Sequence, residues 1–132
     1  MRFFDTHAHL NDESFDTDRA ALIEGLPSCG AELIMDVACA AEDFEKTLEI
    51  TAEYPFIYGA YGIHPHYASD PGENWEARLR RALCDKKAAC LGEIGLDYHY
   101  DLSEKEDQKK LFDYQLKLAK DCLLYTSDAA DD

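Results

Sequence analysis

Short apolar runs alternate with amphipathic stretches along most of the chain. Four runs rich in apolar residues predict strands at residues 2–6, 32–37, 57–61 and 88–94. After each run, apolar residues recur every three or four positions, which predicts helices within residues 15–26, 44–51, 75–83 and 103–119. Asp16 or Thr17 is expected to cap the first helix, and Ser103 with Glu106 forms a capping box for the last. This order predicts an α/β fold with a parallel sheet.

The residues with the strongest chemical character fall at one end of the predicted strands. His7 and His9 follow the first strand, His64 and His66 follow the third, and Glu93 lies at the end of the fourth. In folds of alternating strands and helices, functional groups gather at the carboxyl ends of the parallel strands. We therefore expect these five side chains to lie close together.

Two histidines and one acid form a candidate metal site. His7 and His9 are two positions apart, so on a strand both rings point to one side, and imidazole is a common metal ligand. Alone, such a pair is more typical of two solvated rings on a surface strand. Glu93 favours a metal because an unpaired carboxylate in an apolar strand is costly to bury, and the flanking Gly92 and Gly95 allow close backbone approach.

Composition limits the other possibilities. The 132 residues are enough for one domain, and 46% of them are hydrophobic, as in a globular protein. A formal charge of −15 excludes a strongly basic nucleic-acid surface. Five cysteines without paired spacing predict reduced thiols. Neither a cleavable leader nor an apolar run long enough to cross a membrane is recognised, so we expect a cytoplasmic protein that does not contact membranes.

Three motifs resemble one known family. Asp-Thr-His-Ala-His-Leu at residues 5–10, Gly-Ile-His-Pro-His at residues 62–66 and Gly-Glu-Ile-Gly-Leu-Asp-Tyr at residues 92–98 occur in the order and spacing of the first three motifs of the TatD family. Members of this family are metal-dependent hydrolases, usually described as deoxyribonucleases. The resemblance covers residues 1–121 and implies a TIM-like (β/α)8 barrel of the metallo-dependent hydrolase superfamily.

The resemblance also implies roles for single residues. His7 and His9 bind one metal ion, and Glu93 binds or bridges the metals and acts as the catalytic acidic residue. The full-length parent protein is expected to hold two divalent ions, Mg²⁺ or Zn²⁺. His64, together with His66, is assigned to the substrate and its phosphate. The alternative for both histidines is a turn stiffened by the proline between them.

The resemblance accounts for only half of a barrel. A complete (β/α)8 barrel takes about 250 residues, and the family pattern requires two more histidines and one aspartate from its later strands. We therefore expect residues 1–121 to form an N-terminal half of about four βα units. From Cys122 onward the sequence resembles the translation of a transposon end used in shotgun sequencing. Residues 122–132 are interpreted as adapter read-through, with a native polar tail as the alternative.

Three functions remain open at this point. The leading one is a phosphodiesterase acting on DNA ends, with its general base in the missing half and Asp97 as a loop cap or a base. The second is an amidohydrolase-type barrel for amides or lactones, which often uses a lysine on strand four, whereas Lys86 and Lys87 precede that strand. The third is an inactive fragment with weak metal binding. His99 is expected to be solvated, and no obligate protein partner is inferred.

Overall fold

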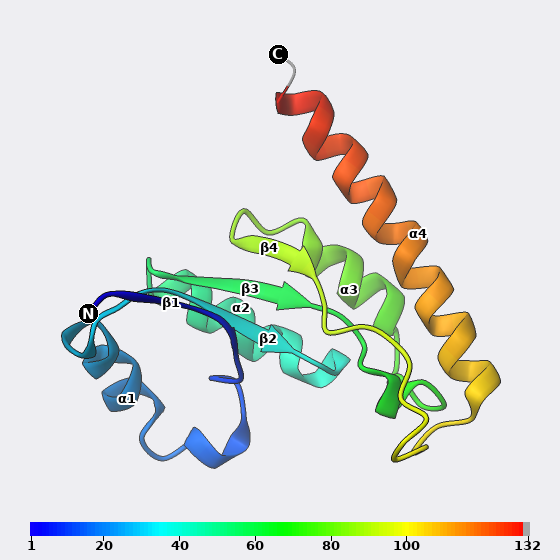
Figure 1. Cartoon of the computed structure of the whole chain (residues 1–132), viewed down its shortest axis with the longest axis horizontal. Helices are drawn as coiled ribbons and strands as arrows, with labels where there is room; N and C mark the ends of the chain where they lie inside the picture. The colour runs from blue at the N-terminus through cyan, green and yellow to red at the C-terminus, as the bar shows by residue number, and fades with distance from the viewer. Residues whose placement is uncertain (131–132) are drawn as a thin grey trace.

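The chain folds as four strands that alternate with helices (Figure 1). The computed structural model describes the backbone of residues 1–130 and the side chains of residues 1–122. The strands are β1 (Phe3–Ala8), β2 (Ala31–Ala38), β3 (Ile57–Tyr61) and β4 (Ala88–Leu91). The α-helices are α1 (Arg19–Gly25), α2 (Phe44–Glu53), α3 (Trp75–Leu83) and α4 (Lys105–Ala130). Short 3-10 turns are η1 (Glu13–Phe15), η2 (Leu26–Cys29), η3 (Ala41–Asp43) and η4 (Pro65–Tyr67).

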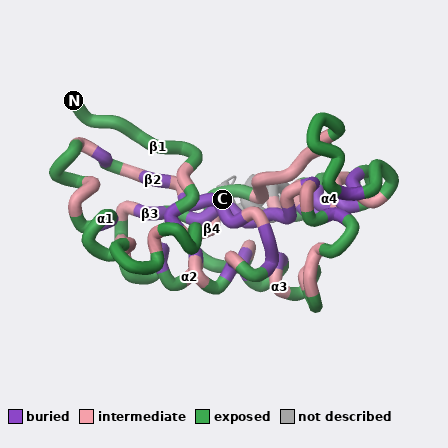
Figure 2. The backbone as a smooth tube through the Cα atoms, turned by 90° about the horizontal axis from the view of Figure 1, so that it is seen from below, coloured by how far each residue is buried: buried purple, intermediate pink, exposed green. Residues whose placement is uncertain are grey.

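The sheet is parallel throughout, in the order β1-β2-β3-β4. Helices α1, α2 and α3 cover one of its faces (Figure 2). The core lies in this layer, where the buried rings of Phe44 and Tyr61 meet edge to face at 5.7 Å. In the described part of the chain the opposite face carries no helix, and Phe4 and Tyr58 are exposed. The predicted α/β class with a parallel sheet is confirmed.

Strand ends differ from the sequence prediction at the two outer strands. β1 continues to Ala8, so His7 lies inside the strand instead of after it. β4 ends at Leu91, and the chain leaves the sheet after Gly92, whose N–H still donates to the carbonyl of Tyr61. The prediction that residues 88–94 form one strand is therefore wrong at its end, and Glu93 lies just beyond β4.

The glycine that permits a close approach here is Gly62, and not Gly92 or Gly95 as predicted. A Cβ on Gly62 would lie 2.8 Å from the carbonyl carbon of Gly92, whereas a Cβ on Gly92 or Gly95 would meet nothing within 4 Å. Side-chain atoms do not tolerate contacts that short, so only glycine at position 62 lets the segment after β4 pass beside β3.

The first helix also begins later than predicted. Its N-cap is Asp18, whereas Asp16 or Thr17 was expected, and Phe15 belongs to the separate turn η1. Asp12 ends the preceding segment by accepting a hydrogen bond from the Ser14 N–H at 2.8 Å, which starts η1 as a turn of its own. A local side-chain bond of this kind competes with helix formation.

Two further expectations concern the whole chain. In the part of the chain that the structure describes, no helix is long and apolar enough to cross a membrane. The interpretation of residues 122–132 as adapter read-through falls almost entirely on side chains outside the described residues, so it stays a prediction.

Candidate metal centre

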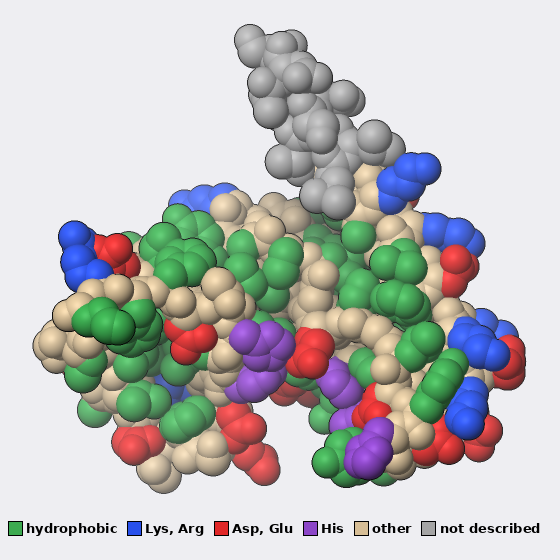
Figure 3. Space-filling model, in the orientation of Figure 1, with side chains coloured by type: hydrophobic (Ala, Val, Ile, Leu, Met, Phe, Trp, Pro, Cys, Tyr) green, Lys and Arg blue, Asp and Glu red, His purple; other side chains and the backbone are tan. Residues whose placement is uncertain are grey.

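Three side chains predicted to bind metal converge at the carboxyl ends of the strands. Ligand atoms of His7, His9 and Glu93 all lie within 4.8 Å of one another. His7 Nε2 is 3.3 Å from Glu93 Oε2, and the two histidine rings are 5.0 Å apart. In Figure 3 histidines and acidic side chains gather at the centre of the face shown. Because β1 and β4 are the outer strands, this contact requires the sheet to curl.

His9 is oriented by the neighbouring strand. Its Nδ1 lies 2.9 Å from the carbonyl oxygen of Val37 at the end of β2. In the neutral ring Nδ1 therefore carries the hydrogen and donates it, which leaves the Nε2 lone pair available. Histidines that bind metals usually have their second nitrogen held in this way.

A buried acid fixes the loop that follows His9. Asp36 in β2 is buried, and its carboxylate accepts hydrogen bonds from the Asn11 backbone N–H at 3.2 Å and side-chain amide at 3.0 Å. On its other oxygen it accepts the Thr47 hydroxyl at 2.8 Å. Burial raises the pKa of this carboxyl. The role of Asp36 was not predicted, since an acid inside an apolar strand gives no sign of its partners.

Glu93 is contacted on both of its oxygens. Oε1 lies 3.7 Å from His64 Nε2, and Oε2 accepts from the Cys39 thiol at 3.6 Å. Burial, with the Glu93 charge as a smaller cause, raises the pKa of Cys39 to about 12, so this thiol keeps its proton. The Glu93 side chain is 37% exposed, which corrects the expectation that it is buried in a strand.

His64 turns its Nε2 toward Glu93, and its ring is neutral. It precedes η4, and its Nδ1 accepts the backbone N–H of His66 at 3.1 Å. The neutral ring must then carry its hydrogen on Nε2, the atom that faces Glu93. Burial lowers the pKa of His64, and the neighbouring His66 lowers it further, so the neutral form is favoured.

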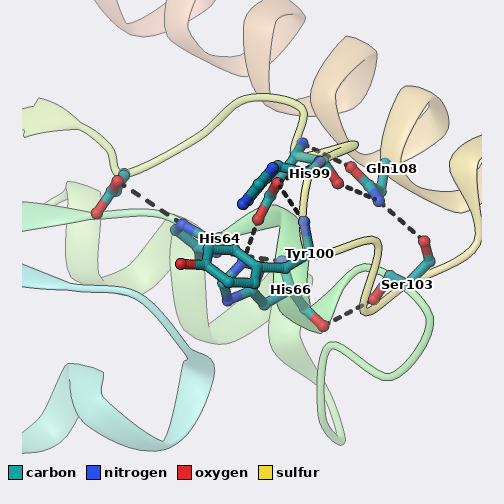
Figure 4. A network of polar contacts seen from close by, with 8 residues as sticks. His64, His66, His99, Tyr100, Ser103 and Gln108 are labelled. Atoms are coloured by element: carbon teal, nitrogen blue, oxygen red, sulfur yellow. Dashed lines mark hydrogen bonds and ion pairs between the residues drawn. The ribbon is translucent and has the colours of Figure 1, made fainter.

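His66 pairs with Asp97 (Figure 4). Hydrogen bonding to His66 is the main cause of a lowered pKa at Asp97. The other carboxylate oxygen of Asp97 accepts the backbone N–H groups of His99 at 2.9 Å and Tyr100 at 3.2 Å. Asp97 therefore caps its loop, as one alternative predicted. The Pro65 turn that was the alternative for the histidines is also present, as η4.

Two buried glutamines of α4 hold these loops and were missed as site residues. Gln108 accepts the Asp97 N–H at 2.8 Å and donates to the carbonyls of Asp97 and Ser103 at 3.1 Å and 2.9 Å. Gln115 accepts the N–H of Ile63 at 2.7 Å and donates to its carbonyl at 3.0 Å, next to His64. A glutamine repeated after seven residues on an otherwise apolar helix face was the available signal.

The Ser103 hydroxyl forms contacts that the capping-box prediction did not include. It accepts from the Ser69 N–H at 3.2 Å and donates to the His66 carbonyl at 2.7 Å. α4 begins at Lys105. Ser103 thus connects the loop before α4 to the η4 region.

Comparison with known proteins identifies the family. The sequence matches the family described as TatD related DNase over residues 4–127. It is 39% identical over 133 residues to the uncharacterized metal-dependent hydrolase YabD of Bacillus subtilis, covering 98% of this chain and 52% of YabD. It is 29% identical over 121 residues to the 3'-5' ssDNA/RNA exonuclease TatD of Cronobacter sakazakii, covering 92% of this chain and 46% of that protein.

Solved structures agree with the sequence matches. The crystal structure of YjjV, a TatD homologue from Escherichia coli, superposes with a TM-score of 0.82 at 35% identity, over 92% of this chain and 48% of YjjV. A TatD family hydrolase from Entamoeba histolytica, 23% identical, supports the fold alone with a TM-score of 0.81. The chain spans about half the length of the curated relatives it matches. The chain belongs to the TatD family of metal-dependent hydrolases.

Proposed function

We propose that this chain supplies the N-terminal part of a metal-dependent phosphodiesterase site that removes nucleotides from the ends of single-stranded DNA or RNA. The observation that carries this proposal is the convergence of His7, His9 and Glu93 within 4.8 Å, with the neutral His64 facing Glu93. The choice of substrate is supported by the similarity to the 3'-5' ssDNA/RNA exonuclease TatD of Cronobacter sakazakii.

The donor set fits a divalent cation. Two imidazoles and one carboxylate suit Zn²⁺ better than Mg²⁺, which prefers oxygen ligands alone. A bound cation supplies a Lewis acid for the phosphoryl oxygen and lowers the pKa of a bound water toward neutrality. We assign the first ion to His7, His9 and Glu93. Glu93 Oε1, turned toward His64, is available to a second ion whose other ligands would come from outside this chain.

The other residues of the site bind the substrate or orient the metal ligands. Val37 holds the His9 ring through its carbonyl, so the ligand atom is positioned before any ion arrives. His64 donates from Nε2 to a phosphate oxygen, for which the neutral ring is sufficient. Asp97 is not assigned as general base because His66 and two backbone N–H groups occupy its two oxygens. We place the base outside this chain.

The amidohydrolase alternative that uses a lysine gains no support. Lys87 donates from Nζ to the carbonyls of Tyr54 at 3.2 Å and Pro55 at 2.9 Å, which precede β3. It therefore lies at the amino end of the strands, away from His7 and Glu93. Lys86 is exposed in the same turn before β4.

A chimera tests the proposed function. We expect a protein that joins residues 1–121 to the C-terminal half of YabD to release nucleotides from single-stranded DNA with Zn²⁺, Mn²⁺ or Mg²⁺, and EDTA to abolish the release. The chain alone should be inactive because we assign three metal ligands and no general base among its described residues. Chelator-sensitive hydrolysis by the chain alone, or a folded chimera without activity, contradicts the proposal.

A further inference from the structure

An exposed tyrosine is connected to the candidate metal centre through the rings of His66 and His64. Tyr100 follows β4 in the loop before α4, and 68% of its surface is exposed. Single exposed aromatic residues are common on protein surfaces, so exposure alone indicates no role. Leu96 and Leu102 of the same loop are also exposed. Tyr100 differs from them because its backbone N–H is hydrogen-bonded and its ring contacts His66 and His99.

The backbone that carries Tyr100 is fixed by the half-buried Asp97 and, behind it, the buried Gln108. Its N–H donates to Asp97 Oδ1 at 3.2 Å, as the N–H of His99 does at 2.9 Å. Asp97 is held in turn by Gln108, which is buried in α4 and also bonds the Ser103 carbonyl (Figure 4). A ring presented by an ordered loop loses little conformational freedom when a ligand packs on it.

Aromatic contacts connect Tyr100 to the site. Its ring lies edge to face with His66 at 6.0 Å, and His66 lies edge to face with His64 at 4.2 Å. His64 then faces Glu93 at 3.7 Å. On its other side Tyr100 contacts His99 at 4.7 Å. The rings thus lead from the metal centre to the surface, and most of the Tyr100 ring remains open to solvent.

The charges around this loop favour a neutral group over an anion. Asp101 and Glu104 are exposed in the same loop, Lys105 lies over the Tyr98 ring at 5.1 Å, and the chain carries a formal charge of −15. A phosphate would be repelled here, whereas every nucleobase is uncharged and presents a π face. We propose that Tyr100 stacks on the base of the terminal nucleotide while the phosphate of that nucleotide lies at His64 and the metal centre.

This assignment rests on the proposed function, and its test separates the two. A short single-stranded DNA carries 2-aminopurine at its 3' end and fluorescein at its 5' end, and is titrated with the chain in Zn²⁺. Fluorescein anisotropy reports binding. Quenching of 2-aminopurine reports stacking of the terminal base. With the unaltered chain we expect both signals.

Variants identify the stacking ring. Tyr100→Ala should abolish the quenching and weaken binding by about 5- to 100-fold, the range found when a base-stacking aromatic side chain is removed. Tyr100→Phe should keep both signals, because stacking needs the ring and not the hydroxyl. The matched control is Tyr58→Ala, which removes an exposed ring from the uncovered sheet face and should change neither signal.

Each other outcome overturns a defined claim. Anisotropy without quenching, or quenching that persists in a folded Tyr100→Ala variant, overturns the stacking site and leaves the proposed function standing. Absence of both signals with the unaltered chain overturns the stacking site, and the activity of the YabD chimera decides the nucleic-acid substrate separately. Circular dichroism of Tyr100→Ala verifies that the fold is retained.

Discussion

Glu93→Ala lowers the turnover of the YabD chimera by at least about a hundredfold, the size of effect expected when one catalytic or electrostatic group is removed. Glu93 approaches His7 with one carboxylate oxygen and His64 with the other, so replacement by alanine removes both contacts. It also removes the only acidic member of the metal triad. Initial rates of nucleotide release from single-stranded DNA at saturating Mn²⁺ measure the effect.

Two further variants test whether the loss of activity is caused by the loss of the Glu93 charge. Glu93→Gln keeps the shape and removes the charge, and we expect it to lose most of the activity because a neutral amide is a poor ligand for a divalent ion. Glu49→Ala removes an exposed carboxylate from α2 and should leave the rate unchanged. If Glu93→Ala stays as active as the unaltered chimera, Glu93 does not belong to the site.

Asp36→Ala lowers the free energy of unfolding of the chain by about 3 kcal/mol, because it removes the acceptor of one buried and two half-buried hydrogen bonds, and an unsatisfied buried donor costs about 1–3 kcal/mol. The donors of these bonds are the Thr47 hydroxyl and the Asn11 amide groups. Since Asn11 also donates to the carbonyl of Val37 at 2.8 Å, which holds His9, the loss extends to the metal triad. Urea denaturation followed by circular dichroism measures the change.

Two control variants separate the effect of losing the hydrogen bonds of Asp36 from the effect of losing a negative charge. Asp70→Ala removes an exposed carboxylate and should shift the free energy of unfolding by less than about 0.5 kcal/mol. Asp36→Asn retains one carbonyl acceptor and should fall between the two. An unchanged urea midpoint for Asp36→Ala shows that the network contributes nothing to stability.

The order of elements follows directly from the sequence. A period of two or of about 3.6 in apolar residues separates strands from helices, so the parallel sheet and β3 were predicted correctly. The candidate site could also be predicted from the order of elements, because residues at the carboxyl ends of parallel strands lie at the same edge of the sheet. His7, His9 and Glu93 therefore come together as expected.

The hydrogen bonds that hold the site residues in place could not be predicted from local sequence patterns. Gln108 and Asp97 bond across eleven positions, and Asp36 meets Asn11 across twenty-five. Such pairs depend on how elements pack, which periodicity does not encode. The same limit explains the glycine error, since the need for glycine at position 62 arises from Gly92 on the neighbouring segment. The end of β4 was misjudged because its apolar run continues after pairing stops.

Zn²⁺ titration by calorimetry tests the metal triad most directly. With three partly exposed ligands, we expect the chain to bind Zn²⁺ with a dissociation constant on the order of micromolar, far weaker than closed structural sites. Replacing His7 and His9 together by alanine should weaken binding by at least about a hundredfold. His99→Ala, which removes an exposed ring, should have no effect. The double variant keeps every cysteine, so binding by thiols would persist in it. Nanomolar affinity that survives the double replacement contradicts the assignment of His7 and His9 as ligands.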